Sequence, residues 1–168
     1  MQKNLCTTLV LIALLFSAGK LTALQSDRQQ PLDATADHFD DNGEGVTVLS
    51  GNVEITQGSL LIRANRATVF RENSAIGRVL IVGEPATVHQ DLDGSQGPMD
   101  ATAATIDYDL ANNQLTMRGD VQVTQMRGQY SGQVMRYDLV SGKIDGGEGQ
   151  DRIRLRLDGG ASGGDNGQ

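Results

Sequence analysis

The sequence predicts an all-β protein of short antiparallel strands, and three observations support this fold class. Apolar and polar residues alternate along most of the chain after residue 24, which is the period-two pattern of half-buried strands. Turn-forming residues separate these stretches roughly every ten residues. This short spacing leaves no room for the crossover helices that parallel strands require. The chain is therefore expected to form antiparallel strands, and a parallel α/β sheet is excluded.

The N-terminal segment, residues 1–23, does not follow this pattern. Lys3 supplies a basic start, residues 5–16 form an apolar run, and small residues follow up to Ala23. This is the layout of a secretory signal peptide, and the run is shorter than the ~20 residues of a membrane span. We expect residues 1–23 to direct export and to be removed, with an uncleaved N-terminal anchor as the alternative.

The alternating segments follow one another through the rest of the chain. In order, they are Val53 and Ile55, Ala67 and Val69, Val79 and Ile81, Ile106 with Tyr108 and Leu110, Leu115 and Met117, Val121 and Val123, and Ile153 with Leu155 and Leu157. Turn sequences between them include Asp41-Asn42-Gly43, Asn112-Asn113 and Ser141-Gly142-Lys143. We expect one β domain over residues 24–158, and a disordered Gly-rich tail over residues 159–168.

The β domain contains an internal repeat. Leu32–Ala36 recurs as Met99–Ala103, and Gly51–Gln57 recurs as Gly119–Gln125. The two pairs of segments are separated by nearly the same offset, which predicts two similar halves. The glycine that opens each copy of the second segment lies inside a strand pattern, where glycine marks a bulge or a bend. We therefore expect a long strand to pass from one sheet layer onto the other at these two glycines.

Composition excludes several classes of function. The 168-residue chain has a net charge of −7, 4% aromatic residues, one cysteine and two histidines. Without Lys3 and Lys20, 12 basic residues remain against 21 acidic ones, which gives a net charge of −9. Nucleic-acid binding needs a basic surface, and a zinc site needs several Cys or His ligands. We therefore expect a protein without enzymatic activity, without a cofactor or metal, and without a nucleic-acid partner.

Several segments together resemble one family. They are Gly51–Gly58, Ile62–Val69, Gly83–Val88, Ala103–Leu110 and Gly119–Gln125. In this order, over about residues 30–140, the chain resembles the LptA/OstA family of periplasmic lipopolysaccharide transport proteins. The resemblance implies a twisted antiparallel β-jellyroll, open along one side, whose apolar interior holds the acyl chains of lipid A. It also implies that such domains stack end to end into a bridge from the inner to the outer membrane.

The resemblance also implies site residues and partners. The lipid-facing positions fall on Leu32, Ala34, Val88, Tyr108 and Leu110, although Ala34 is smaller than the family's usual residue there. Because the expected inner residues are small or β-branched, we predict an apolar trough open at both ends; the alternative is that these are ordinary core residues. The implied partners are lipopolysaccharide, an inner-membrane-anchored LptC-like protein, the N-terminal domain of the outer-membrane translocon, and further copies of the chain.

The C-terminal segment is the expected joint between copies. It alternates without a break, with three arginines on one face and three apolar residues on the other: Arg152, Ile153, Arg154, Leu155, Arg156 and Leu157. An edge strand of this kind can pair with another chain. The acidic region that could receive it contains Asp33, Asp37, Asp40, Asp41 and Glu44. The alternative is a solvated edge strand.

Two other functions remain open from the sequence. Residues 146–153 match one copy of a calcium-binding nonapeptide, which would suit a secreted structural β-repeat or calcium-binding protein. Such sites form between stacked copies, and the chain holds only one. His38 lies between Asp37 and Asp40, which would suit an enzyme acting on polysaccharide, but no nucleophile accompanies them at a readable spacing.

Overall fold

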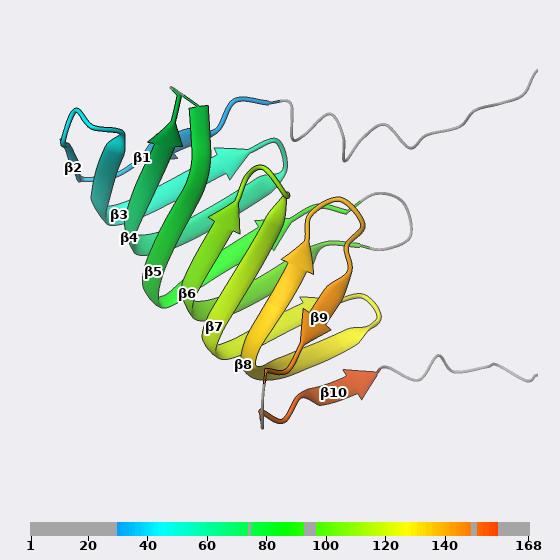
Figure 1. The fold of residues 1–168 in the computed structure, drawn as a ribbon. Helices are drawn as coiled ribbons and strands as arrows, with labels where there is room; N and C mark the ends of the chain where they lie inside the picture. The colour runs from blue at the N-terminus through cyan, green and yellow to red at the C-terminus, as the bar shows by residue number, and fades with distance from the viewer. Residues whose placement is uncertain (1–29, 74, 93–96, 149–150, 158–168) are drawn as a thin grey trace, which may run out of the picture.

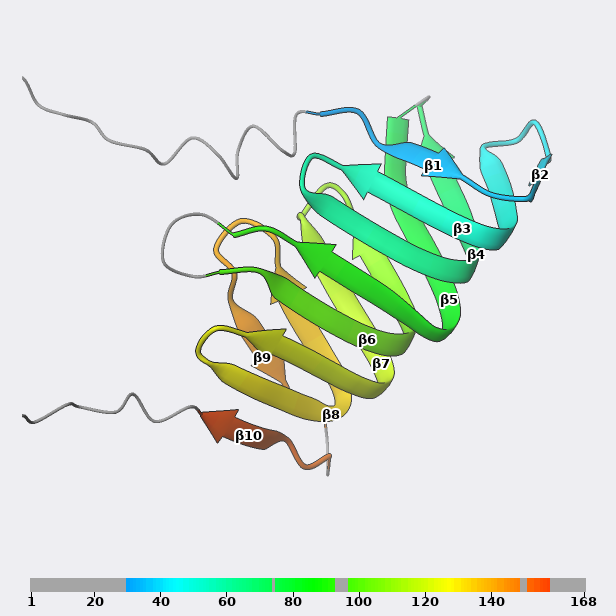
Figure 2. The same ribbon diagram turned by 180° about the vertical axis from the view of Figure 1, so that it is seen from behind.

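Long bent strands form the body of the protein (Figures 1 and 2). The computed structural model describes residues 30–73, 75–92, 97–148 and 151–157. The long strands are β3 (Val46–Gln57), β4 (Leu60–Glu72), β5 (Ala75–Gln90), β6 (Met99–Asp109), β7 (Gln114–Gln125) and β8 (Gly128–Asp138). The short strands are β1 (Asp33–Thr35), β2 (His38–Asp41), β9 (Ile144–Gly146) and β10 (Arg154–Leu157).

All ten strands belong to one antiparallel sheet. Its order is β1-β3-β4-β5-β6-β7-β8-β10, with β2 also paired to β3 and β9 also paired to β8. Each long strand therefore pairs with the next one along the chain, as the short spacing between strands requires. The all-β, antiparallel fold class predicted from the sequence is confirmed.

The sheet folds over on itself because every long strand bends near its middle. The register between neighbours shifts at these points, for example between Ser50 and Val53 and between Arg118 and Val121. We call residues 46–50, 66–72, 75–82, 105–109, 114–118 and 134–138 the first layer. The second layer contains residues 53–57, 60–64, 86–90, 99–103, 121–125 and 128–132. The bends stack along one side of the molecule (Figure 1).

The two repeat copies have the same backbone shape at their bends. Gly51 and Asn52 have φ angles of 75° and 44°, and Gly119 and Asp120 have 81° and 46°. Two successive residues in the left-handed region interrupt the extended backbone and bend the strand, and glycine favours this conformation. A Cβ at Gly119 would also lie 2.8 Å from the Cβ of Ala104. The predicted bends at these two glycines are confirmed.

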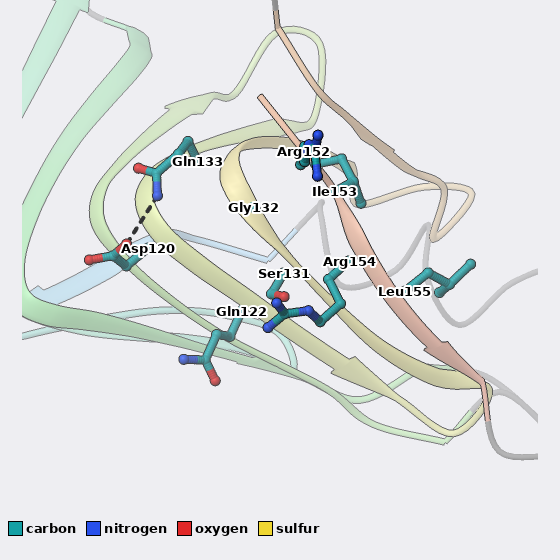
Figure 3. Close-up of a pocket in the computed structure, with 9 residues that line it drawn as sticks. All are labelled: Asp120, Gln122, Ser131, Gly132, Gln133, Arg152, Ile153, Arg154 and Leu155. Carbon is teal, nitrogen blue, oxygen red and sulfur yellow. Dashed lines mark hydrogen bonds between the residues drawn. The ribbon is translucent and has the colours of Figure 1, made fainter. Parts of the chain in front are cut away.

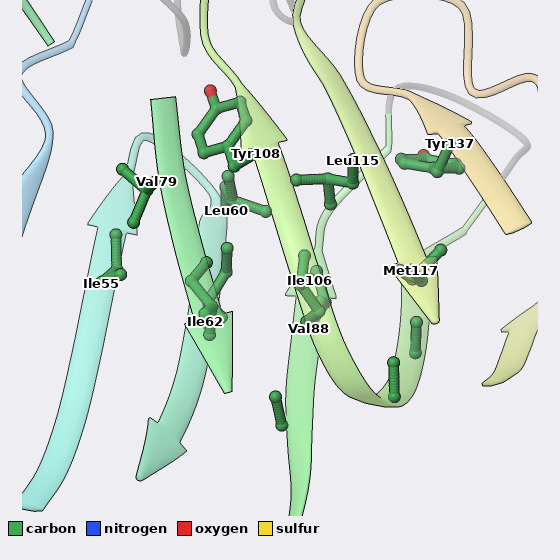
Figure 4. Packing of buried hydrophobic residues seen from close by; sticks show 14 of the residues in the cluster. Ile55, Leu60, Ile62, Val79, Val88, Ile106, Tyr108, Leu115, Met117 and Tyr137 are labelled. Atoms are coloured by element: carbon green, nitrogen blue, oxygen red, sulfur yellow. The ribbon is translucent and has the colours of Figure 1, made fainter. Parts of the chain in front are cut away.

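Apolar side chains from both layers fill the space between them (Figure 4). The cluster includes Val53, Ile55, Val121 and Val123 of the two repeat copies, each no more than 1% exposed. Its largest members are tyrosines, methionines, isoleucines and leucines. The protein's own side chains thus fill the middle of the interior, where the sequence predicts an open trough.

The two ends of the sheet expose apolar side chains. At the end of the sheet formed by β1 and β2, Phe39 pairs with Leu49 yet is 68% exposed. At the opposite end, formed by β9 and β10, Leu155 pairs with Tyr130 and is 52% exposed. Leu49 and Tyr130 both pack against the interior cluster, and paired residues point to the same face of a sheet. The apolar inner face therefore continues beyond the filled part at both ends.

The predicted signal peptide (residues 1–23) and tail (residues 159–168) lie outside the described residues. All described strands fall within the predicted domain, residues 24–158. No helix among the described residues is long and apolar enough to cross a membrane.

Candidate functional site

Four of the five predicted lipid-facing residues share the interior. Val88 in β5 and Tyr108 in β6 are 2% and 1% exposed, and both belong to the buried cluster. Leu32 and Leu110 are half-buried and pack against that cluster. Ala34 differs, because it is exposed in the edge strand β1, opposite Ile55. The structure therefore brings residues from distant parts of the sequence to one apolar interior.

The hydroxyl of Tyr108 connects the two layers. It donates a hydrogen bond to Oε1 of Gln57 in the second layer at 2.6 Å. Gln57 Nε2 in turn donates to the backbone carbonyl of Gln30 at 3.2 Å, close in sequence to Leu32. This hydrogen bond lies on the side of the molecule away from the bends, where hairpins connect the strands. It therefore joins the two layers on that side. Gln57 is a site residue that the sequence reasoning missed.

Three further polar atoms are buried near the same side without a hydrogen bond of normal geometry. They are Oε1 of Gln90, Nε2 of Gln125 and the hydroxyl of Tyr137. Burial raises the pKa of Tyr137 to about 12, while the nearby Gln125 amide acts in the opposite direction. The hydroxyl is therefore protonated at neutral pH. Gln125 occupies the same position in the repeat as Gln57. This shared position was the one signal in the sequence that pointed to these buried polar groups.

The predicted assembly segment lies along the last edge of the second layer. β10 covers Arg154–Leu157 and pairs with Gly128–Ser131 of β8, so the edge strand is already paired on one side within its own chain. Arg152 and Arg154 line a pocket of about 830 Å³ together with outward-facing polar residues of β7 and β8, including Gln122 and Gln133 (Figure 3). All residues from Arg152 to Leu157 are exposed.

Ile153 covers the end of the interior next to this edge. Its Cδ1 atom lies 2.5 Å from the position that a Cβ on Gly132 would occupy, and 3.1 Å from the equivalent position on Gly146. The side chain of the buried Met135 borders the same space. The two glycines thus form a notch that accepts this one side chain, and the C-terminal segment is held there by packing as well as by pairing.

The acidic residues at the opposite end are exposed, and some are engaged locally. The Gly43 backbone N–H, the Thr47 hydroxyl and Arg71 hold the pKa of Asp41 below its usual value. Asp37 accepts a hydrogen bond from Asn52 at 2.8 Å. This use of Asp37 gives it a structural role at the first bend.

The described residues offer no group of three or more His, Cys, Asp or Glu side chains placed to hold a metal ion. The predicted nonapeptide at residues 146–153 includes residues 149 and 150, which lie outside the described part. The chemistry that this interior presents is apolar contact with a few buried hydrogen-bonding groups. Such a site suits a ligand with long apolar chains.

Comparisons with known proteins agree with this geometry. A family model described as "LptA/(LptD N-terminal domain) LPS transport protein" matches residues 31–143. The lipopolysaccharide export system protein LptA of Haemophilus influenzae is 31% identical over 154 residues, which is 89% of each chain. LptA of Escherichia coli K12 is 29% identical over 145 residues, covering 84% of this chain and 78% of that protein.

A solved structure is also similar. It is the crystal structure of LptH of Pseudomonas aeruginosa, described as the LptA-homologous periplasmic component of a lipopolysaccharide transport device. The two structures superpose with a TM-score of 0.73 at 26% identity, over 80% of this chain and 99% of that chain. LptH itself is 33% identical over 118 residues, covering 69% of this chain and 67% of the LptH sequence.

Proposed function

The chain belongs to the LptA/LptD N-terminal domain family of lipopolysaccharide transport proteins, and from this premise we propose how it handles its cargo. It is a periplasmic component of lipopolysaccharide export that holds the lipid A acyl chains between its two β layers. The observation that carries this proposal is the single apolar interior, which contains most of the predicted lipid-facing residues and continues as exposed apolar side chains at both ends.

Burial of acyl chains supplies the binding energy in this proposal. Each CH₂ group transferred from water to an apolar interior contributes ~0.8 kcal/mol. The inner face of Val, Ile, Leu, Ala and Met side chains offers contacts that depend little on direction. The acyl chains can then move along the interior without breaking directional contacts, which suits transport rather than chemical turnover.

The topology indicates where the acyl chains enter. Every hairpin from β3 to β8 joins two segments of the same layer, so within residues 46–138 the layers are joined covalently only at the bends. On the opposite side they meet through side chains, including the hydrogen bond from Tyr108 to Gln57. Because the interior is filled without lipid, the layers separate on that side as the acyl chains replace contacts between core side chains.

The partners follow from the same premise. We propose that the ends of the sheet join an inner-membrane-anchored LptC-like protein, the N-terminal domain of the outer-membrane translocon, and further copies of this chain. Exposed apolar residues at both ends, Phe39 at one and Leu155 and Leu157 at the other, support this proposal. The relatives are export proteins, and we propose that this chain likewise acts by binding and transfer.

The test is co-purification of the protein from Gram-negative cells, followed by analysis of bound lipid. The wild-type protein is expected to carry lipopolysaccharide. Val88→Asp places a charge in the interior and should reduce the bound lipid strongly. Thr87→Asp is the matched control, because Thr87 is the exposed neighbour on the outer face of the same strand.

Stability has to be measured alongside, since a charge in a core can unfold the domain. Leu110→Asp provides a second variant, because Leu110 is only half-buried and should tolerate the charge better. A folded Leu110→Asp protein that carries as much lipopolysaccharide as the wild type would contradict the proposed interior site. Absence of lipopolysaccharide from the wild-type protein would contradict the proposed function.

A further inference from the structure

A row of glutamines lines the inner rim of the second layer. The last residues of β3, β5 and β7 are Gln57, Gln90 and Gln125. Gln57 lies opposite Leu60, Gln90 lies opposite Met99, and the ladder between β6 and β7 places Gln125 in the same row. Leu60 and Met99 are buried, so this row faces the interior. Amide and apolar side chains therefore alternate along the rim, on the side away from the bends.

A matching row of tyrosines lines the first layer. Tyr108 pairs with Leu115, and Leu115 pairs with Tyr137, so all three side chains point to the same face (Figure 4). Each is no more than 1% exposed. The two rows face each other across the rim, since Tyr108 reaches Gln57 and Tyr137 lies beside Gln125.

The hydrogen bonds across the rim are complete at one end only. Gln57 accepts from Tyr108 and donates to the Gln30 carbonyl. Oε1 of Gln90, by contrast, is buried without a partner, while the Tyr137 hydroxyl and the Gln125 amide lie beside each other without a hydrogen bond of normal geometry. Proteins rarely leave buried polar groups unpaired, because each has lost its hydrogen bonds to water. Gln90 is only 3% exposed, so water has little access to form a hydrogen bond with it.

We infer that Gln90, Gln125 and Tyr137 bind the linkage region of an N-acylated glucosamine, where amide and ester groups join acyl chains to the sugar. This inference rests on the proposed function, since it assigns part of the same lipid to part of the same interior. The Tyr137 hydroxyl and the Gln125 Nε2 are donors suited to carbonyl oxygens. Oε1 of Gln90 is an acceptor suited to an amide N–H or a hydroxyl group.

The geometry also explains how such a lipid is distinguished from an ordinary membrane lipid. A phosphatidylcholine offers ester carbonyls as acceptors but no donor for Gln90. An N-acylated glucosamine offers both acceptors and donors within a few bonds of the acyl chains. The acyl chains then occupy the apolar rows, while the linkage satisfies the polar atoms at the rim.

The experiment compares two lipids and two variants. Lipid A and a phosphatidylcholine of matched chain length, each in the same mild detergent, are titrated against the purified protein. Gln90→Leu and Tyr137→Phe should each weaken lipid A binding about three- to tenfold, and Gln90→Leu should leave phosphatidylcholine binding unchanged. The melting temperature of lipid-free Gln90→Leu should not fall, because it loses a buried oxygen that had no partner.

Gln122→Leu is the matched control, because Gln122 is exposed on the outer face of β7 and should leave both affinities unchanged. Tyr137→Phe removes a single oxygen atom, so it decides the question if Gln90→Leu folds poorly. Lipid A affinity equal to that of the wild type in the folded variants, or an equal loss for both lipids in Gln90→Leu, overturns the rim site but leaves the proposed function intact. A wild-type protein that binds no lipid A contradicts the proposed function instead.

Discussion

His89 is placed to make stability depend on pH. Its Nδ1 lies 2.8 Å from the Asp100 carboxylate, and its Nε2 lies 3.4 Å from Asp91. The hydrogen bond to Asp100 is the main cause that raises the pKa of His89 above its ordinary value of 6.5. A raised histidine pKa adds stability below the unfolded-state pKa, and this stability is lost as pH rises through the folded-state pKa.

The expected outcome is a pH-dependent difference between the wild type and His89→Gln. The free energy of unfolding should favour the wild type at about pH 5.5, and the advantage should disappear by about pH 8.5. Because the side chain is 41% exposed, the difference should be about 0.5 kcal/mol or less. Urea unfolding at several pH values measures it, and a gap that grows with pH would contradict the assignment.

Residues of the inner face were predictable, while the polar rim was not. Val53, Ile55, Val121 and Val123 alternate with polar residues in the sequence, and this pattern alone placed them inside. Gln57 and Gln125 follow the same alternation on the inner face, but a polar residue at the end of a strand is usually solvated. Only the pairing of distant strands shows that these amides face tyrosines of the other layer.

At the scale of the strand, the bend at Gly119 can be tested directly. Gly119→Ala should lower the free energy of unfolding by about 1–3 kcal/mol, because a residue with a Cβ is strained at a φ of 81°. The added Cβ would also lie 2.8 Å from the Cβ of Ala104. Thermal or urea unfolding measures the loss.

Gly77→Ala is the control for this substitution. Gly77 also lies within a long strand, but a Cβ there would meet no atom within 4 Å, and its φ is not positive. Its effect should stay within about 0.5 kcal/mol. Equal effects of the two substitutions would show that the bend does not depend on glycine.

The C-terminal strand provides the second prediction at this scale. Truncation after Gln150 removes β10 and Ile153, which cover the last edge of β8 and the end of the interior beside Met135. The remaining strands retain their own pairings, so the domain should stay folded but lose concentration-dependent head-to-tail assembly. Circular dichroism checks the fold, and sedimentation or light scattering checks the assembly. If the truncated protein assembles as well as the full chain, the joint lies elsewhere.

The resemblance and the strand pattern anticipated the bends, but the pairing of β10 could not be deduced from them. The alternation in residues 152–157 predicted an edge strand with separate apolar and basic faces. This alternation does not indicate which strand the predicted edge strand pairs with. The notch formed by Gly132 and Gly146 explains why the segment folds back on its own chain, and it becomes visible only when β8 and β9 are placed together.

Across the whole molecule, net charge and lipid binding act in opposite directions. The exported chain is expected to carry a charge of −9, so it should repel a lipid that carries phosphates. Since apolar burial dominates the proposed binding, lipid A affinity should be retained or rise slightly between about 0.05 M and 0.5 M salt. Titrations at several salt concentrations test this. A steep loss of affinity with salt would indicate that phosphate contacts carry the binding.

The overall architecture was predictable to a useful degree. Strand periodicity and the internal repeat indicated an antiparallel all-β domain of two similar halves, and the family resemblance supplied the open jellyroll. The filled interior was not anticipated, because small inner residues suggested empty space. The volume between two layers depends on how closely they approach, and large side chains such as Tyr108, Tyr137, Met99 and Met135 occupy it here.

The two ends of the sheet differ, and this difference determines what kind of polymer the chain can form. One end carries β1 and β2 with their acidic surroundings, and the other carries β9 and β10 with three arginines. A contact between unlike ends has no twofold axis, so each added copy leaves the same pair of ends unused. Growth of such a filament has no internal stopping point. Its length would be fixed by whatever stands at its two termini, and therefore by the width of the compartment that it crosses.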